Sequence, residues 1–156
     1  MKPISENEVL ADIRSLCARL PFVLLYRNNV GERTDEYGNH FAYGLCEGSS
    51  DLIGILRDVR HVSSVSGEVV KVRVGVFLAI EVKRPGKTPT PQQYDFLDLV
   101  RRMGGVAFWA DSVGKVADEL EAATGEAATI RAALDAVLAA KAKRAARRSR
   151  VLKVST

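Results

Sequence analysis

The sequence contains few of the residues that most zinc and redox sites need. Its 156 residues include two cysteines, Cys17 and Cys46, which stand apart without a CxxC or other ligand spacing, and two histidines, His40 and His61. The cysteines are therefore interpreted as reduced, partly buried thiols. A structural zinc site or an HxxxH-type catalytic site would lack ligands in this chain.

Long apolar runs are also missing. No stretch approaches eighteen uncharged apolar residues, so no membrane span is expected. The opening MKPISENEVL has acidic residues where a signal peptide is apolar, which predicts a cytoplasmic location. With 47% hydrophobic residues, the chain suits one globular domain with a real core.

Positive charge is concentrated at the C-terminal end. Residues 131–156 carry eight Lys and Arg against one acid, whereas residues 1–130 carry fifteen basic and eighteen acidic residues. A basic tail on a near-neutral body indicates a polyanionic partner, most simply nucleic acid; a solvated, frayed helix end is the alternative. The tail, residues 126–156, is expected to be helical and not a separate domain. Its candidates for contact with nucleic acid are Lys141, Lys143, Arg144, Arg147 and Arg148.

Hydrophobic periodicity predicts an α/β domain built on a small mixed sheet. Residues 28–50 are expected to form a polar loop, and residues 57–74 are ambiguous, with a hairpin around Ser66-Gly67 favoured. The strand at 75–83 is apolar on both faces, as in a central strand covered by helices on each side. The predicted order is α-β-β-β-α-β with a helical tail: helix 5–20, strands 22–27, 51–56 and 75–83, helix 90–103, strand 106–110, and helices 112–123 and 127–150.

Two charged residues end the most apolar strand. Glu81 and Lys83 project from the same face because side chains alternate along a strand, and Asp51 opens a strand that can pair beside this one. Two adjacent carboxylates are best neutralised by a hard divalent cation, for which the carbonyl of Val82 is a further candidate ligand. Lys83 would then lie where it can orient or deprotonate an attacking water, or stabilise charge on a phosphate. An ordinary surface ion pair is the alternative, although the rest of the strand is apolar.

The first helix offers two further acids. Glu6 extends the apolar stripe of this helix backwards, which predicts a carboxylate directed inward from the first turn. Glu8 fits a capping box with Ser5 and therefore has a structural role available.

Several motifs together resemble the PD-(D/E)xK nuclease superfamily, and within it the small VRR-NUC domains found as stand-alone phage and bacterial proteins. The resemblance covers roughly residues 5–112 and is carried by EVLADIRSLCARLPFVLLYRNNVG (8–31), GSSDLIG (48–54), FLAIEVKRPGK (77–87), TPTPQQYDFL (88–97) and GGVAFWADS (104–112). In one departure, Ser50 stands where the superfamily has proline. In another, residues 57–74 are longer than the minimal connection.

The resemblance implies a restriction-endonuclease-like core over residues 1–125 and a DNA endonuclease that depends on Mg²⁺ or Mn²⁺. It implies that Asp51 is the metal-binding acid, that Glu81 and Lys83 are the E-x-K pair, and that Gln93 lies near the site. The first-helix acid would be Glu6, with Glu8 as the alternative. Gln93 also fits a capping box with Thr90. Members of the group resemble Holliday-junction resolvases in fold, and those without extra domains tend to be homodimers, so branched DNA is one candidate substrate.

Other basic and polar residues are candidates for holding the DNA backbone. Arg84 and Lys87 follow the proposed metal site directly, while Arg27 and Asn28 follow the first strand, where an ordinary polar turn is the alternative. The competing interpretations of the whole chain are a catalytically silent nucleic-acid-binding protein and an assembly protein anchored by its basic helix.

Overall fold

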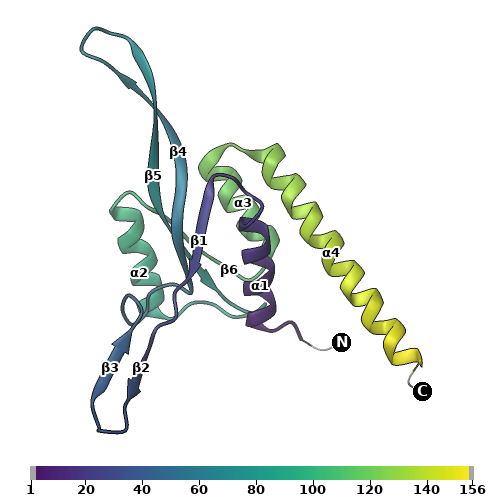
Figure 1. Cartoon of the computed structure of the whole chain (residues 1–156). Coiled ribbons are helices and arrows are strands. Elements are labelled where there is room, and N and C mark those ends of the chain that lie inside the picture. Colours follow the sequence, from purple (N-terminus) through teal and green to yellow (C-terminus); the bar gives the residue numbers. More distant parts are fainter. Residues whose placement is uncertain (1–2, 155–156) are drawn as a thin grey trace.

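The computed structural model describes the backbone of residues 3–154 and the side chains of residues 3–147. Four strands form a mixed sheet in the order β1-β4-β5-β6: β1 (Val23–Arg27), β4 (Leu52–Ser63), β5 (Val69–Val82) and β6 (Val106–Ala110) (Figure 1). β4 is antiparallel to both β1 and β5, and β6 is parallel to β5. The predicted α/β class with a mixed sheet is confirmed.

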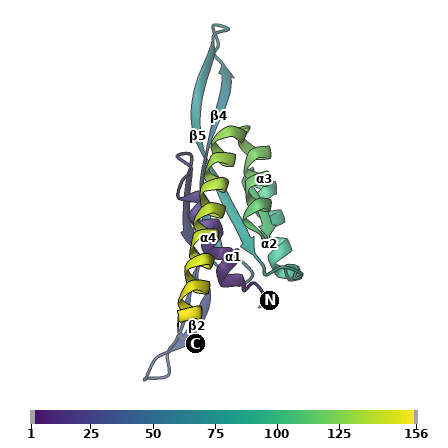
Figure 2. The ribbon, with the colours of Figure 1, turned by 90° about the vertical axis from the view of Figure 1, so that its right-hand side faces the viewer.

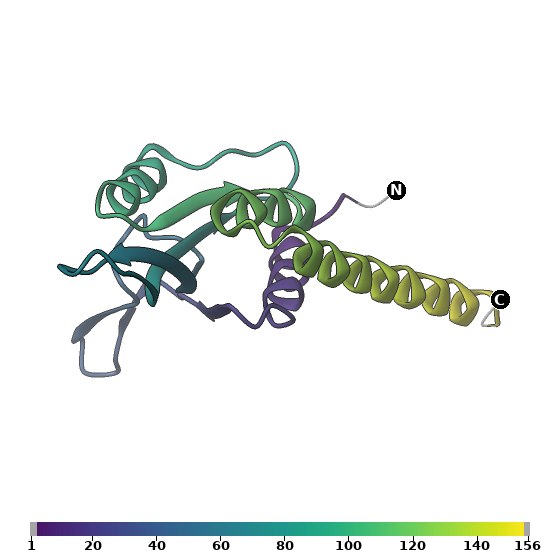
Figure 3. The same cartoon turned by 90° about the horizontal axis from the view of Figure 1, so that it is seen from above.

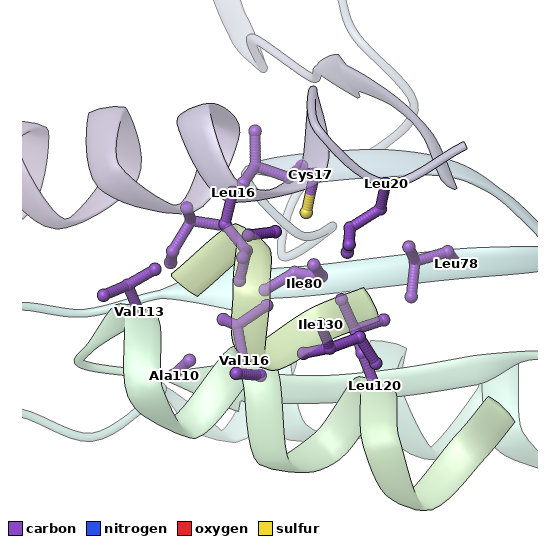
Figure 4. Packing of buried hydrophobic residues seen from close by; sticks show 14 of the residues in the cluster. Leu16, Cys17, Leu20, Leu78, Ile80, Ala110, Val113, Val116, Leu120 and Ile130 are labelled. Carbon is purple, nitrogen blue, oxygen red and sulfur yellow. The ribbon is translucent and has the colours of Figure 1, made fainter. Parts of the chain in front are cut away.

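Helices cover both faces of this sheet. The larger core lies against α1 (Glu6–Cys17), α3 (Val113–Thr124) and α4 (Ala127–Val154), and the smaller core lies against α2 (Pro91–Arg102). Figure 4 shows Leu16 of α1, Ile80 of β5 and Leu120 of α3 among the side chains that fill the larger core. The prediction that residues 75–83 are buried on both faces holds for the C-terminal part of β5, Leu78–Val82, whereas the part of β5 before Leu78 is exposed or half-buried.

Capping residues set where the helices begin. Ser5 and Glu8 form a reciprocal capping box on α1, and Thr90 and Gln93 form another on α2, where Pro91 occupies the first helical position. Both caps were predicted from the sequence. The expected helix over 5–20 is too long, because α1 ends at Cys17 and the following residues form tight turns that lead into Pro21, which disfavours helical backbone in the residue before it.

Of the two free cysteines, only Cys17 fits the prediction of buried thiols. Cys17 lies in the core, where burial raises the pKa of its thiol to about 12. Cys46 is exposed, because it lies in the loop that precedes β4.

Two hairpins project from opposite ends of the sheet (Figures 1 and 2). The first, formed by β2 (Gly31–Thr34) and β3 (His40–Tyr43), lies in the segment expected to be a loop, so that prediction is wrong. Its tight turn is held by Asp35, whose carboxylate accepts hydrogen bonds from the backbone N–H groups of Tyr37 and Asn39. The second hairpin joins β4 to β5 and confirms the favoured turn around Ser66-Gly67. Apart from β2 and β3, the element order is the predicted one.

The C-terminal helix docks at its beginning and projects at its end (Figure 3). Ile130, Ala133 and Val137 of α4 are buried, and Lys141 then pairs with Asp12 of α1 at 2.5 Å. The helix continues to Val154, beyond the predicted end at Arg150. No helix within residues 3–154 is both long enough and apolar enough to cross a membrane.

Candidate active site

The register of β4 and β5 brings Asp51 and Glu81 together. Leu52 pairs with Ile80, so Asp51, one residue before Leu52, lies opposite Glu81 on the same face of the sheet. Asp51 is held there by its own bonds, because Oδ2 accepts the backbone N–H of Val82 at 2.9 Å and its carbonyl accepts the N–H of Asn28 at 2.8 Å. The expected juxtaposition of the two carboxylates is present.

Glu81 is the one fully buried carboxylate among the described side chains, with 0% of its surface exposed. Lys83 Nζ donates to Glu81 Oε1 at 2.5 Å, whereas Oε2 is buried without a hydrogen-bond partner. Burial raises the pKa of Glu81 to about 7; the bond from Lys83 lowers it, and the nearby charge of Asp51 raises it. A buried carboxylate with an unused oxygen favours an additional positive charge close by.

These donors suit a hard divalent cation. Glu81 Oε2 lacks a partner, and Asp51 has Oδ1 left over, so the two residues offer oxygen ligands of the kind that Mg²⁺ and Mn²⁺ prefer. No group of three or more His, Cys, Asp or Glu residues capable of holding a metal occurs among the described residues. The protein would therefore contribute two carboxylates and the carbonyl of Val82, with water and substrate phosphate completing the shell, as is usual for Mg²⁺.

Gln93 lies on the first turn of α2, which begins at the end of the sheet where β5 ends (Figure 1). Its side-chain oxygen accepts the N–H of Thr90 at 2.9 Å. No hydrogen bond joins it to Glu81 or Lys83 in the described part of the chain, so its observed role is that of a cap.

The prediction that Glu6 is directed inward is wrong. Glu6 is exposed, because the buried stripe of α1 begins one turn later, at Val9. Glu8 is the alternative acid. Its carboxylate accepts hydrogen bonds from the backbone N–H and the hydroxyl of Ser5, as in a capping box. Neither acid makes a hydrogen bond to Asp51 or Glu81 among the bonds described.

The side chain of Asn28 forms hydrogen bonds within the protein and does not point toward a ligand as a free donor. Its side-chain nitrogen donates to Ser49 Oγ at 2.9 Å and to the carbonyl of Ser50 at 3.0 Å, while its oxygen accepts the N–H of Leu45 at 3.3 Å. Both polar atoms of its side chain are thus used within the protein. The predicted phosphate contact by Asn28 is replaced by a structural role, which fixes the loop that leads into Asp51.

Sequence reasoning assigned no role to Ser50. This residue is 1% exposed, directly precedes Asp51, and has a hydroxyl without a hydrogen-bond partner in the described structure. The signal was present as a polar residue where the superfamily has proline. A buried hydroxyl without a partner in the protein is usually satisfied by an ordered water.

Basic residues border the site on one side. Arg84 and Lys87 are exposed and belong to one tight turn, in which the N–H of Lys87 donates to the carbonyl of Arg84 at 3.1 Å and Gly86 has φ +81°. A positive φ at this position needs glycine, so the turn is set by the Pro-Gly pair. Arg27 is exposed at the end of β1.

The tail candidates divide into paired and free residues. Lys141 is paired with Asp12 where α4 lies beside α1, and 48% of its side chain is still exposed. Lys143, Arg144 and Arg147 are exposed. Arg148 lies outside the residues whose side chains are described.

Comparison of the chain with protein-family models, with curated proteins and with solved structures finds no match. The resemblance to VRR-NUC domains therefore stays a prediction that depends on the motifs and on the site geometry.

Proposed function

We propose that this protein is a DNA endonuclease of the PD-(D/E)xK type, with a restriction-endonuclease-like core, that uses Mg²⁺ or Mn²⁺. The observation that carries the proposal is the buried Glu81, whose Oε2 lacks a partner while Asp51 lies opposite and Lys83 binds Oε1. A structural ion pair alone would not need a second carboxylate beside it, since adjacent carboxylates repel each other.

The reaction proposed is hydrolysis of a phosphodiester by water. Water attacks phosphorus and the P–O bond to the leaving oxygen breaks, without a covalent enzyme intermediate; the attacking water gives up a proton to solvent, and the leaving oxygen takes one up. Asp51 and Glu81 would hold the cation, which supplies Lewis acidity and a more acidic bound water. Lys83 Nζ lies 2.5 Å from Glu81 Oε1, where it can stabilise negative charge that develops on the phosphate. Arg84 and Lys87 are placed to hold the DNA backbone.

The test is a cleavage assay on labelled single-stranded, duplex, nicked, flap and four-way-junction DNA, with MgCl₂, MnCl₂ or EDTA. We expect cleavage that requires metal and that falls at least about 100-fold in Glu81→Gln. Glu36→Gln is a matched control, because Glu36 is an exposed carboxylate in the β2–β3 turn. Cleavage that persists in EDTA, or that Glu81→Gln leaves intact, would contradict the proposal. Binding without any cleavage would favour the silent nucleic-acid-binding protein.

A further inference from the structure

The β4–β5 hairpin extends well beyond the sheet as a two-stranded ribbon. β1 pairs with β4 only as far as Leu56, and β6 pairs with β5 only from Leu78. Residues 57–63 and 69–75 therefore pair with each other alone and form the twisted arm seen in Figures 1 and 2. An isolated two-stranded ribbon is at best marginally stable in water, so an arm of this length is suited to contact a partner.

Strand alternation separates the charges of this ribbon onto its two faces. Residues directly opposite each other in an antiparallel pair share a face. The pairs Arg57–Gly75, Val59–Arg73 and His61–Lys71 therefore lie on one face, and the pairs Asp58–Val74, Arg60–Val72 and Val62–Val70 lie on the other. We call the first the basic face, defined by Arg57, His61, Lys71 and Arg73.

The cations of the basic face form no ion pair within the described protein, although Glu126 lines the same cavity as Arg57. The only acid in the paired strands of the ribbon is Asp58, which lies on the opposite face and is paired with Arg60 at 3.1 Å. Arg57, Lys71 and Arg73 are exposed and form no ion pair among the described residues. Three cations without a carboxylate among them would be complemented by a polyanion.

We propose that the basic face of the β4–β5 ribbon binds the phosphate backbone of duplex DNA. This inference rests on the proposed function, because it takes DNA as the substrate, and it adds a second contact surface away from Glu81. A two-stranded ribbon is narrow enough to enter the major groove, which is about 12 Å wide. Arg73 lies eight residues before Glu81 on the same strand, a separation of about 27 Å at the usual rise per residue. The ribbon would thus contact phosphates about eight base pairs from the bond to be cut.

A second copy of the chain is the competing occupant of the ribbon. Exposed valines lie on both faces: Val62, Val70 and Val72 on the opposite face, between 38% and 50% exposed, and Val59 and Val69 on the basic face, 48% and 64% exposed. The basic face differs from the opposite one in its charge: it carries Arg57, Lys71 and Arg73 without an acid, and two copies of it would repel each other. The charge distribution therefore favours DNA on the basic face.

The test measures binding by fluorescence anisotropy on a labelled 24-bp duplex, in EDTA and over a range of salt concentrations. For the triple variant Arg57→Gln/Lys71→Gln/Arg73→Gln we expect a loss of affinity of at least about 10-fold at low salt. The slope of log K against log salt should fall by about 2 to 3, near 0.9 for each lost phosphate contact. Arg73→Gln and Arg60→Gln form a matched pair, because both remove one positive charge from the same ribbon on opposite faces. Arg73→Gln should weaken binding and lower the slope by about 1, and Arg60→Gln should do neither.

Because binding is measured without metal, this experiment is independent of cleavage. Unchanged affinity and salt slope in a triple variant with a wild-type circular dichroism spectrum and melting curve would overturn the inference, even if Glu81-dependent cleavage is found. Loss of binding in the triple variant, with no cleavage by the wild type, would support the ribbon contact and contradict the nuclease. A triple variant that changes only the sedimentation of the protein, from dimer to monomer, would assign the face to a second copy and overturn the inference.

Discussion

Two lysine–carboxylate pairs of this protein have the same N–O distance of 2.5 Å and very different surroundings. In the Lys83–Glu81 pair the side chains are 13% and 1% exposed, and in the Lys141–Asp12 pair they are 48% and 19% exposed. Water and salt screen the second pair but scarcely reach the first. Distance alone therefore says little about what a charge pair does, and burial decides how strongly each group depends on its partner.

The largest effect is expected from removing one partner of the buried pair. Lys83→Met leaves the Glu81 carboxylate buried and unpaired, so the free energy of unfolding at pH 8 without metal should fall by about 3 kcal/mol or more. The double variant Glu81→Gln/Lys83→Met should recover most of that loss, because no charge is then left in the core. Urea unfolding followed by circular dichroism measures both. A loss below about 1 kcal/mol in Lys83→Met would mean that water reaches this pair as freely as a surface pair.

The pH dependence of the free energy of unfolding also tests the burial of the Glu81 carboxyl group. The pKa of Glu81 is raised to about 7 in the folded protein, so the folded state binds this proton more tightly than the unfolded state does. Its stabilising contribution is complete below the unfolded pKa, near 4.5, and is lost as pH rises through about 7. In EDTA, the stability of wild type relative to Glu81→Gln should fall by about 3 kcal/mol between pH 4.5 and pH 8. A difference that stays constant over this range would contradict the raised pKa.

Metal should replace the proton at this site. At a fixed concentration that is ten times the Kd at pH 6, Mg²⁺ or Mn²⁺ should stabilise the wild type by about 1.4 kcal/mol at that pH and by more at pH 8, because protons compete with the metal. Thermal unfolding with and without metal measures the effect. Asp51→Asn and Glu81→Gln should both abolish it, whereas Glu36→Gln should keep it. Equal stabilisation of all four proteins would place the bound metal elsewhere.

The smallest effect is expected at the exposed pair. Lys141→Gln should change the free energy of unfolding by less than about 1 kcal/mol, and the change should shrink as salt is added. The docking of α4 depends instead on the buried Ile130, Ala133 and Val137. A cost comparable to that of Lys83→Met would contradict the distinction drawn between the two pairs.

The sequence predicted the parts of the fold that depend on local rules. The capping residues Ser5 and Thr90 and the apolar strand before Glu81 are strong signals of this kind, and each was found where expected. The β2–β3 hairpin was missed because its strands have four residues each and are mostly exposed, so they carry no apolar alternation.

The positions of site residues could be predicted where they depend on strand register. They could not be predicted where they depend on tertiary packing. The meeting of Asp51 and Glu81 follows from pairing two strands whose ends were already recognised. Glu6 lies on the extrapolated stripe of α1, but a helical period does not show that packing begins one turn later. The Lys141–Asp12 pair joins residues 129 positions apart, and no local pattern indicates such a contact.

The fourteen residues of β5 carry Glu81 and two cations of the basic face, Lys71 and Arg73, on one uninterrupted strand. The distance between Glu81 and these cations is therefore set by the length of the strand, since no flexible linker lies between them. Inserting two residues in each strand, between Leu56 and Arg57 and between Gly75 and Val76, would lengthen it by about 7 Å and keep every side chain on its face. Inserting one residue in each would turn the basic face over. The position at which DNA is held relative to the cut would thus be encoded in the length of a strand.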